Sequence, residues 1–143
     1  MKHIEISTEN ARLDLAVVHR FLTQESHWAR GIDRATVERS VRHSLCFGAY
    51  RGSAQVGFAR VVTDRATFAF VCDVFVLAEA RGQGVARLLV QAITCHPDLQ
   101  GLRRMALTSR DAKGLYERVG FATLANPERW MERYVPSIYG AAS

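Results

Sequence analysis

The sequence predicts a single α/β domain whose mixed sheet carries helices on both faces. Three observations support this fold class: two amphipathic segments come first, strand patterns and a long apolar run follow, and helical and strand patterns then alternate. A chain of 143 residues has the length of one domain. Its 48% hydrophobic and 23% charged residues exclude disordered and fibrous chains.

Two helices are expected before the first long strand. Apolar residues recur at helical spacing from residue 10 to about residue 24, which indicates an amphipathic helix. A second helix is expected to begin near Asp33, a favourable N-cap residue. The segment between them, residues 26–32, opens with polar residues and is expected to be a loop exposed on one side.

Strand patterns begin at Leu45. LCFGAY and QVGFARVVT are separated by the turn signal of residues 51–53, which predicts two consecutive strands. The run at residues 66–77 is apolar at both parities, as in a central strand covered on both faces. Its one charge, Asp73, is expected either at a strand irregularity or in a functional site, because a buried carboxylate is costly unless it is paired.

The last third of the chain alternates between helix and strand. The predicted elements are a glycine turn at residues 79–84, a helix at 85–96, a strand at 105–108, a short helix at 111–119, a hairpin from Phe121 to about residue 134 and a short tail from Ser137. No linker or repeat divides the sequence, so residues 1–143 are expected to form one domain with its core at about 3–135.

The glycine turn predicts an anion-binding site. Gly82 and Gly84 allow positive φ and close approach of a ligand, and the helix that follows points unpaired N–H groups to the same place. A P-loop is disfavoured because the chain has no Gly-Lys pair. A dinucleotide fingerprint is disfavoured because Arg87 stands at the position of its third glycine.

Charge and cysteines identify no partner by themselves. The net charge is +5, and 17 of the 19 cationic side chains are arginines, which suits an anionic partner but also fits arginine-rich codon usage. No nucleic-acid partner is expected, because there is no basic run or RNA-binding aromatic pattern. The chain has no uncharged apolar run of about 18 residues and no signal-like N-terminus, so a cytoplasmic protein without membrane binding is expected. The spacing of cysteines and histidines predicts neither disulfides nor a metal site.

Two motifs resemble those of a known family. Arg81-x-x-Gly84-x-Ala86, after a strongly apolar strand, matches the Gln/Arg-x-x-Gly-x-Gly/Ala signature of the GNAT superfamily of N-acetyltransferases. The segment DAKGLYERVGF resembles the second conserved block of that family at Ala112, Leu115, Tyr116, Gly120 and Phe121. The resemblance covers about residues 3–135 and extends to one bacterial branch of the family. It implies a mostly antiparallel sheet and N-acetyltransferase activity.

The resemblance also implies acetyl-coenzyme A as the cofactor. The central strand of the family diverges from its neighbour and pairs with the pantetheine arm, and the matching positions are Val74, Phe75 and Val76. The pyrophosphate would lie on the turn and the start of the helix, at Arg81, Gly82, Gln83, Gly84, Val85, Ala86 and Arg87. Ser109 stands where many relatives have an Asn that contacts the cofactor, and serine reaches less far.

For catalysis, the resemblance implies direct attack of an amine on the acetyl group, with Tyr116 as proton donor to the departing sulfur. Some relatives carry a glutamate on the strand before the second motif, but residues 103–108 contain no carboxylate. Asp73 is the remaining general-base candidate, acting directly or through water, and a purely structural role is the alternative. Covalent catalysis through Cys72 is not expected, because no base stands near it in the sequence.

The acceptor pocket would be formed by the loop between the first two helices and the C-terminal hairpin. Its candidates are His27, Trp28, Arg30 and Trp130. The two tryptophans would form the walls of a pocket for a small amine, and Arg30 would select an acceptor that carries a carboxylate. The alternative is that the tryptophans only pack against the protein and that Arg30 is solvated. We expect acetyl transfer to a primary amine of a small molecule or peptide. The alternative is a catalytically weak module that binds or senses coenzyme A. The resemblance allows a homodimer, although the sequence shows no clear interface.

Overall fold

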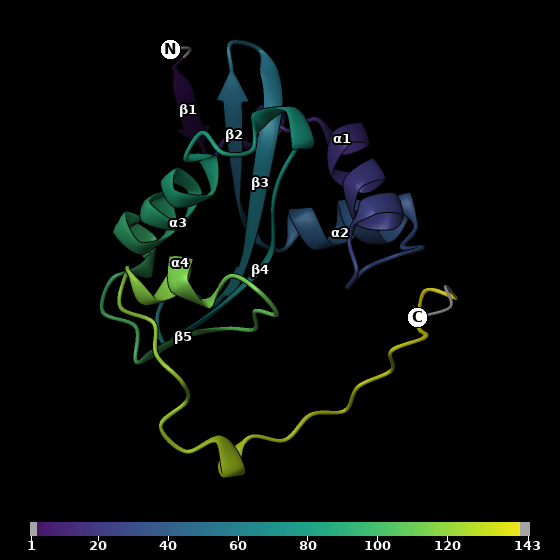
Figure 1. The fold of residues 1–143 in the computed structure, drawn as a ribbon. Helices are drawn as coiled ribbons and strands as arrows, with labels where there is room; N and C mark the ends of the chain where they lie inside the picture. The colour runs from purple at the N-terminus through teal and green to yellow at the C-terminus, as the bar shows by residue number, and fades with distance from the viewer. Residues whose placement is uncertain (1–2, 141–143) are drawn as a thin grey trace.

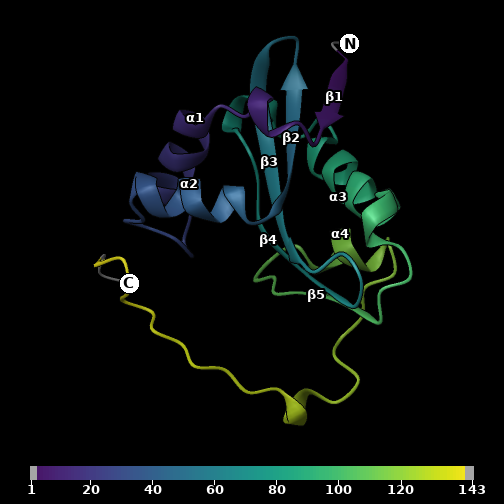
Figure 2. The same ribbon diagram turned by 180° about the vertical axis from the view of Figure 1, so that it is seen from behind.

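The computed structural model describes residues 3–140 and confirms the predicted fold class. One five-stranded sheet has helices on both faces, as the two opposite views of the ribbon show (Figures 1 and 2). Its strands, in spatial and chain order, are β1 (Ile4–Ser7), β2 (Leu45–Arg51), β3 (Ala54–Thr63), β4 (Phe68–Val76) and β5 (Arg104–Leu107). Neighbouring strands are antiparallel except β4 and β5, which are parallel.

Four α-helices cover the sheet. They are α1 (Leu15–Arg20), which a π-helical turn (Phe21–Glu25) continues, α2 (Arg34–Arg42), α3 (Val85–Cys95) and α4 (Lys113–Glu117). Asp33 caps α2 as predicted, because its carboxylate accepts a hydrogen bond from the Thr36 amide at 3.0 Å. No helix in residues 3–140 is both long and apolar enough to cross a membrane.

The sheet separates two hydrophobic clusters. On one face α3 packs its buried residues, Val85, Leu89 and Ile93, against the strands. On the other face α1, the π-turn and α2 pack against Phe58 and Phe75. Both faces of β4 are thereby covered, which explains why both its odd-numbered and its even-numbered residues are mostly apolar.

Strand β1 is not among the predicted elements. It has four residues and lies at the edge of the sheet, antiparallel to β2, with Ile4 opposite Arg51 and Ser7 opposite Gly48. Ile4 and Ile6 pack against the cluster that includes α3. A strand of this length with no turn signal beside it carries little periodicity, so its pairing with β2 decides its conformation.

The predicted C-terminal hairpin is wrong. Residues 121–140 form no strand, and their only regular element is a 3₁₀ turn at Pro127–Arg129. Figure 1 shows this segment, in light green and yellow, leaving the body near α4 and passing beneath it toward the side of α2. Pro127 and Pro136 have no N–H to donate, and no strand within residues 3–140 pairs with the segment.

Candidate functional site

A cavity of about 710 Å³ lies between the loop after α1, the second half of β4 and the loop that leads to α4. Its lining brings together six candidate site residues chosen from the sequence: His27, Trp28, Asp73, Val74, Ser109 and Tyr116. The volume lies within the range of small-molecule sites, and the walls combine apolar side chains with a few polar groups.

The second half of β4 has one open edge at this cavity. Strand β5 pairs with residues 68–71 of β4 and ends at Leu107, whereas β4 continues to Val76. Residues 72–76 therefore pair only with β3 within the described part of the chain. Exposed peptide groups on a strand edge need hydrogen-bond partners, so this edge is suited to an extended ligand that carries amides.

Val74, Phe75 and Val76 lie on this part of β4, but their side chains differ. Phe75 is buried and stacks on Phe21 with ring centroids 4.0 Å apart, so its side chain belongs to the core. Val74 and Val76 pack on the opposite face, against the cluster that includes α3. Any contact of Phe75 with a ligand at the β4 edge would be made by its peptide group.

Asp73 lies at a bulge in β4, which is the first of the two predicted alternatives, and its side chain also lines the cavity. Asp73 and Val74 lie opposite Ala59 alone, because Arg60 pairs with Cys72 and Phe58 pairs with Phe75. The backbone of Asp73 has a φ of 53°, a left-handed conformation that aspartate tolerates better than most residues.

Both carboxylate oxygens of Asp73 accept hydrogen bonds. Arg60 Nε donates to Oδ2 at 2.8 Å, and Trp28 Nε1 donates to Oδ1 at 2.8 Å. The side chains of Arg60 and Asp73 are 19% and 10% exposed, which makes this a largely buried ion pair. Burial works against the charged guanidinium, but the Asp73 carboxylate beside it raises the pKa of Arg60 overall, so Arg60 stays protonated.

Trp28 is held at the cavity from two sides. Its indole binds Asp73, and its loop is closed by Ser26, whose hydroxyl donates to the Leu22 carbonyl at 2.6 Å and accepts from the Ala29 amide at 3.0 Å. His19 Nε2 lies 3.0 Å from the Ile32 carbonyl and anchors the end of the loop. The polar residues that open residues 26–32 predict a loop correctly, but they do not predict that the loop is attached to β4.

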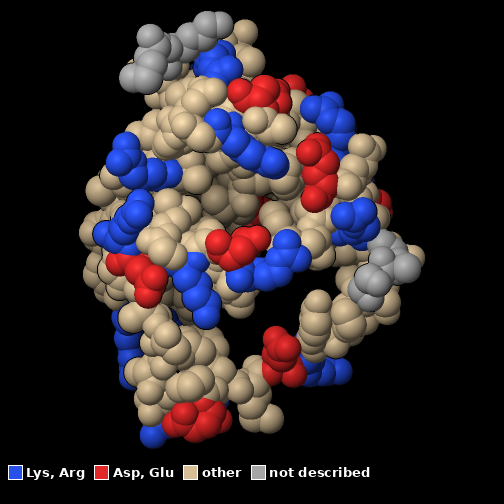
Figure 3. All heavy atoms as spheres, in the orientation of Figure 1, with Lys and Arg blue, Asp and Glu red and all other residues tan. Residues whose placement is uncertain are grey.

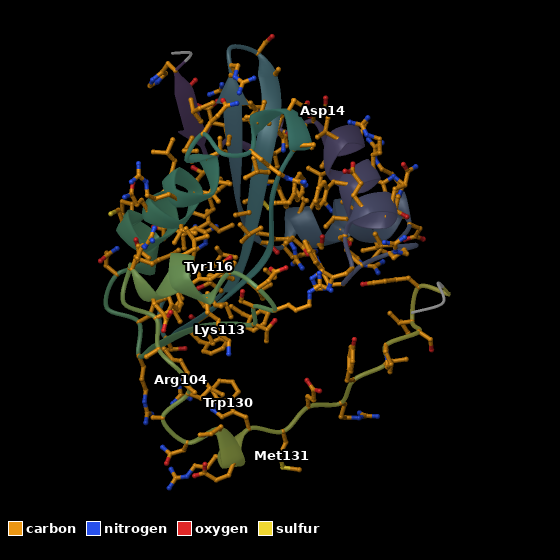
Figure 4. All side chains as sticks on the ribbon, viewed as in Figure 1. Asp14, Arg104, Lys113, Tyr116, Trp130 and Met131 are labelled. Carbon is orange, nitrogen blue, oxygen red and sulfur yellow. The ribbon has the colours of Figure 1, made fainter. Side chains whose placement is uncertain are left out.

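Tyr116 extends from α4 toward the body of the molecule and lines the large cavity (Figure 4). Its ring packs edge-on against Phe121 with centroids 5.9 Å apart. Burial of the ring raises the pKa of the phenol above its ordinary value near 10, so the hydroxyl keeps its proton throughout the neutral range. Near pH 7 the Tyr116 phenol therefore has a proton that it could donate, and it could not act as a base.

Ser109 positions the start of α4. Its hydroxyl accepts a hydrogen bond from the Ala112 amide at 2.9 Å, and the residue lines the large cavity. A hydroxyl has a second lone pair and a proton to donate, so this role leaves one acceptor and one donor position available for further contacts.

The glycine turn adopts the conformation that the sequence predicts. Gly82 and Gly84 have φ values of 75° and 80°, and Gly84 is the N-cap of α3. The first α3 amide with a backbone acceptor is that of Leu88, which bonds to the Gly84 carbonyl at 3.1 Å. The amides of residues 85–87 are consequently available to an anion at the positive end of the helix dipole.

The side chains around the turn hold it against the sheet. Arg81 Nε donates to the Val76 carbonyl at 3.1 Å, and Gln83 Oε1 accepts from an Arg51 guanidinium nitrogen at 2.6 Å. The Val85 side chain is buried, so only its amide is available to a ligand. These contacts fix the glycine turn directly after the open edge of β4.

Two predicted acceptor residues lie outside the large cavity. Arg30 is exposed and does not line it. Trp130 lies below β5, with the Arg104 guanidinium 5.0 Å from its ring centroid, as Figure 4 shows. Trp28 and Trp130 therefore do not form opposite walls of one pocket. The prediction depended on a C-terminal hairpin that the chain does not form.

Sequence inspection missed Arg60 and Tyr139, which both line the cavity. A single arginine within the apolar strand QVGFARVVT was a usable signal for Arg60, because a buried cation needs a carboxylate partner. Tyr139 had no such signal, since only the course of residues 121–140 brings it to the cavity.

Cysteine chemistry is unfavourable at this site. Cys72 lines the cavity beside Asp73, and burial raises the pKa of its thiol to about 12. Burial has the same effect on Cys46. Almost no thiolate is present at neutral pH, and the thiolate is the nucleophilic form. This supports the expectation that no covalent intermediate forms on cysteine.

The chain is similar to known proteins in sequence and in fold. Residues 42–123 match the family model of the acetyltransferase (GNAT) domain. A Gibberella zeae protein provisionally named an acetyltransferase is 29% identical over 133 residues, which cover 78% of this chain and 74% of that protein. A crystal structure from Xanthomonas campestris pv. campestris, of a protein assigned to the GNAT acetyltransferases, is 50% identical, covers 99% of both chains and has a TM-score of 0.95.

A more distant structure shows the same fold with a ligand. AAC(6')-Iy, in complex with the bisubstrate analogue CoA-S-monomethyl-acetylneamine, is 21% identical and has a TM-score of 0.62, with 93% of this chain and 95% of that chain covered.

The reactivity of the three thiols tests this wall of the cavity. Cys95 is exposed, Cys46 is buried and Cys72 is partly exposed, and burial raises the pKa of both Cys46 and Cys72 to about 12. Iodoacetamide at pH 7.5 should alkylate Cys95 rapidly in the folded protein and Cys46 and Cys72 far more slowly, because the thiolate is the reactive form, as peptide mass mapping would show. Denaturation before labelling is the control and should make all three react alike. Labelling of Cys72 as fast as Cys95 in the folded protein would contradict the raised pKa of Cys72.

Proposed function

Because the chain belongs to the GNAT family of acetyltransferases, we propose that it transfers the acetyl group of acetyl-CoA directly to a primary amine of a small molecule or peptide. One observation carries this proposal: the open edge of β4 leads from the anion-binding turn at residues 82–87 to the cavity lined by Asp73 and Tyr116. A ligand with phosphates at one end, amides in the middle and a reactive group at the other end matches this order.

The residues present fit coenzyme A. The unpaired amides of residues 85–87 would hold the pyrophosphate, with Arg81 and Arg87 beside them. The peptide groups of Val74, Phe75 and Val76 would pair with the pantetheine amides. Acetyl-CoA supplies a thioester, whose carbonyl carbon is attacked by the amine while the sulfur leaves as a thiolate.

The protein's contribution is to position the reactants and move two protons. Tyr116 donates its phenolic proton to the departing sulfur, because burial keeps this hydroxyl protonated at neutral pH. A β4 amide donates to the developing oxyanion, a type of contact typically worth about 3 to 4 kcal/mol. Asp73 takes the amine proton, directly or through water, on an oxygen lone pair that Arg60 and Trp28 leave free.

Trp28 and His27 would form the acceptor side of the cavity, and Asp73 keeps the Trp28 loop in place. The Arg60 charge nearby is already neutralised by Asp73, so it does not repel a protonated amine strongly. Arg30, although outside the cavity wall, lies on the same loop as Trp28 and could meet only the outer end of a long acceptor.

Glycine at position 84 should determine cofactor affinity. Replacing Gly84 with Ala places a Cβ at a residue with a φ of 80°, which strains the turn and moves the amides that would bind phosphate. We expect the G84A protein to bind coenzyme A at least about tenfold more weakly in calorimetry, a loss of roughly 1.4 kcal/mol.

Gly101→Ala is the matched control. Gly101 has a φ of 71° and, like Gly82, has no atom within 4 Å of the position that a Cβ would occupy, but it lies far along the chain from the turn. Its substitution should cost similar backbone strain and leave coenzyme A affinity unchanged. Equal affinity in the G84A and G101A proteins would argue against the turn as the phosphate site.

Tyr116→Phe should lower kcat for acceptor-dependent release of coenzyme A by a factor on the order of 10², while cofactor affinity stays within about twofold. In the unsubstituted protein the raised pKa of Tyr116 means that kcat should not fall between pH 7 and about pH 10 through loss of this proton. Above that range ionisation removes the donor, and the Y116F protein should lack this alkaline decline.

Tyr50→Phe is the control for loss of a phenol. The Tyr50 hydroxyl is buried without a hydrogen-bond partner among the described residues, so its removal should not harm the fold or the turnover. Coenzyme A binding with no turnover on a broad panel of amines would favour the alternative function, a module that binds or senses coenzyme A. Absence of coenzyme A binding would refute both functions.

Asp73→Asn separates the catalytic role of this residue from its structural one. Asparagine can still accept from Trp28, but it leaves the Arg60 charge unpaired, so the double variant Arg60→Gln/Asp73→Asn restores neutrality. If Asp73 takes the amine proton, both proteins should lose about 10² in kcat at pH 7 and recover toward the alkaline range, where the free amine predominates. Unchanged kcat in the double variant at pH 7 would leave Asp73 with a positioning role only.

A further inference from the structure

Arg60 is a cation in the wall of the acceptor cavity, and only part of its hydrogen-bonding capacity is used. Its Nε donates to Asp73 Oδ2 at 2.8 Å, and its Nη1 donates to Ser44 Oγ at 3.0 Å. Within residues 3–140, the other terminal nitrogen, Nη2, donates to no acceptor. It is not a buried atom without a partner, so solvent reaches it. Because Arg60 lines the cavity of about 710 Å³, this nitrogen is available to a ligand there.

The ion pair with Asp73 fills only half of one side of the guanidinium. Arginine often binds a carboxylate through two parallel hydrogen bonds, one from Nε and one from the terminal nitrogen on the same side, Nη2. Asp73 accepts only the first, because its Oδ1 is turned to the indole of Trp28, whose Nε1 donates at 2.8 Å. A donor of Arg60 therefore remains unfilled next to the Asp73 carboxylate, and a ligand oxygen can occupy this place.

The free donor is held in a fixed direction. Asp73 and Ser44 bind the guanidinium from two sides, and the backbone of Arg60 is held in β3, opposite Cys72 of β4. A ligand that binds Nη2 therefore restricts little further motion of the protein, which favours affinity. A lysine at position 60 would also neutralise Asp73, but its single nitrogen would not present a second donor in a fixed plane.

The charges of the cavity favour a ligand with no net charge. Among the described residues, the Arg, Lys, Asp and Glu side chains of its wall are two arginines and two aspartates: Arg60, Asp73, Arg110 and Asp111. The second pair is mostly exposed, with 3.7 Å between its charged groups. Figure 3 likewise shows basic (blue) and acidic (red) side chains interspersed over one side of the molecule. On the inner wall, one fixed negative group lies beside one fixed positive group.

We propose that the acceptor is a free α-amino acid, whose carboxylate binds Arg60 Nη2 while its amine lies at Asp73. This inference rests on the proposed function, because it names the acceptor of the same transfer. The two protein groups are joined by a 2.8 Å contact, so the ligand groups that bind them must also be close together. One carbon separates the amine and the carboxylate of an α-amino acid, and its zwitterion has no net charge. The first residue of a peptide has no carboxylate at this position.

The carboxylate takes no part in the bond changes, so Arg60 would determine specificity. The ammonium group loses one proton to Asp73, directly or through water, and the amine nitrogen attacks the acetyl carbon as the carbon–sulfur bond breaks. Tyr116 gives its proton to the sulfur, and the second proton of the nitrogen restores the phenol through solvent. The products are an N-acetyl-α-amino acid, coenzyme A and one proton. The product has no ammonium group for Asp73 to bind, which favours its release.

The first experiment compares matched acceptors. The proteinogenic L-α-amino acids and their α-carboxamides are assayed by chromatography of the coenzyme A released from acetyl-CoA. The amide replaces the carboxylate with a neutral group of similar size and resembles the start of a peptide. We expect kcat/KM of the best amino acid to exceed that of its amide by a factor of about 10 to 100, mainly through KM. The amide has the lower ammonium pKa and more free amine, so basicity cannot produce this preference.

Arg60→Lys tests the residue itself. If Arg60 binds the carboxylate, the preference of the R60K protein for the amino acid over its amide should fall at least about fivefold, through a higher KM for the amino acid. If Arg60 only holds Asp73, both acceptors should lose the same factor, and the unchanged preference would overturn the proposal. Arg42→Lys, at an exposed position of α2 outside the cavity wall, is the matched control and should leave both acceptors unaffected.

Ser44→Ala provides a second variant that keeps the ion pair. Ser44 does not line the cavity, so its hydroxyl acts on an acceptor only by holding Arg60. The S44A protein should have a KM for the amino acid that is higher by a factor of about 3, with KM for the amide unchanged. An equal change for both acceptors would contradict a role of Arg60 in binding the carboxylate, whether or not the R60K protein folds.

Direct binding separates this inference from the proposed function. Calorimetry on the protein loaded with coenzyme A should show at least about tenfold weaker binding for the amide, and also for the β-amino homologue, whose two groups are one carbon further apart. Turnover with equal kcat/KM for acid and amide would overturn the inference and leave acetyl transfer intact. Absence of turnover with every amine would refute the transfer, and the calorimetry would still decide the inference. Tighter binding of the amino acid would support it, whereas equal binding, or none, would overturn it.

Discussion

The early end of β5 is the constraint on which the rest of the site depends. This strand stops at Leu107, while its neighbour β4 continues to Val76, so five residues of a buried central strand keep one open edge. Buried peptide groups without partners are costly, and a fold retains them only where something else pairs with them. The glycine turn follows within a few residues, so chain connectivity alone places the open edge and the free amides at the start of α3 in line.

The bulge at Asp73 places chemistry at the point where β4 becomes unpaired. One extra residue opposite Ala59 gives Asp73 its left-handed backbone, and its carboxylate joins Arg60 on β3 to Trp28 on the loop after α1. An ion pair that is mostly shielded from water contributes little net stability, but removing one partner is expensive. The triad therefore holds a loop, a strand and a charge at fixed positions around the cavity, which is a requirement for orienting an acceptor.

The local chemistry of this chain could be predicted from its sequence, but its long-range contacts could not. The glycine turn, the α2 cap at Asp33 and the helix that carries Tyr116 depend on neighbouring residues and are found where predicted. The pairing of Arg60 with Asp73 and the attachment of Trp28 join segments 13 and 45 residues apart, and no periodicity encodes them. Strand β1 is too short to be recognised without its partner.

The failed hairpin prediction is of another kind, because local strand preference in residues 121–140 meets no strand to pair with among residues 3–140. Trp130, Tyr134 and Val135 favour strands, yet Trp130 meets β5 through its ring, which lies 5.0 Å from the Arg104 guanidinium, and not through its backbone in a ladder. The apolar residues that predict a strand are therefore exposed. The same irregular course brings Tyr139 to the cavity that Trp28 and Asp73 line, a long-range contact that strand propensity does not encode.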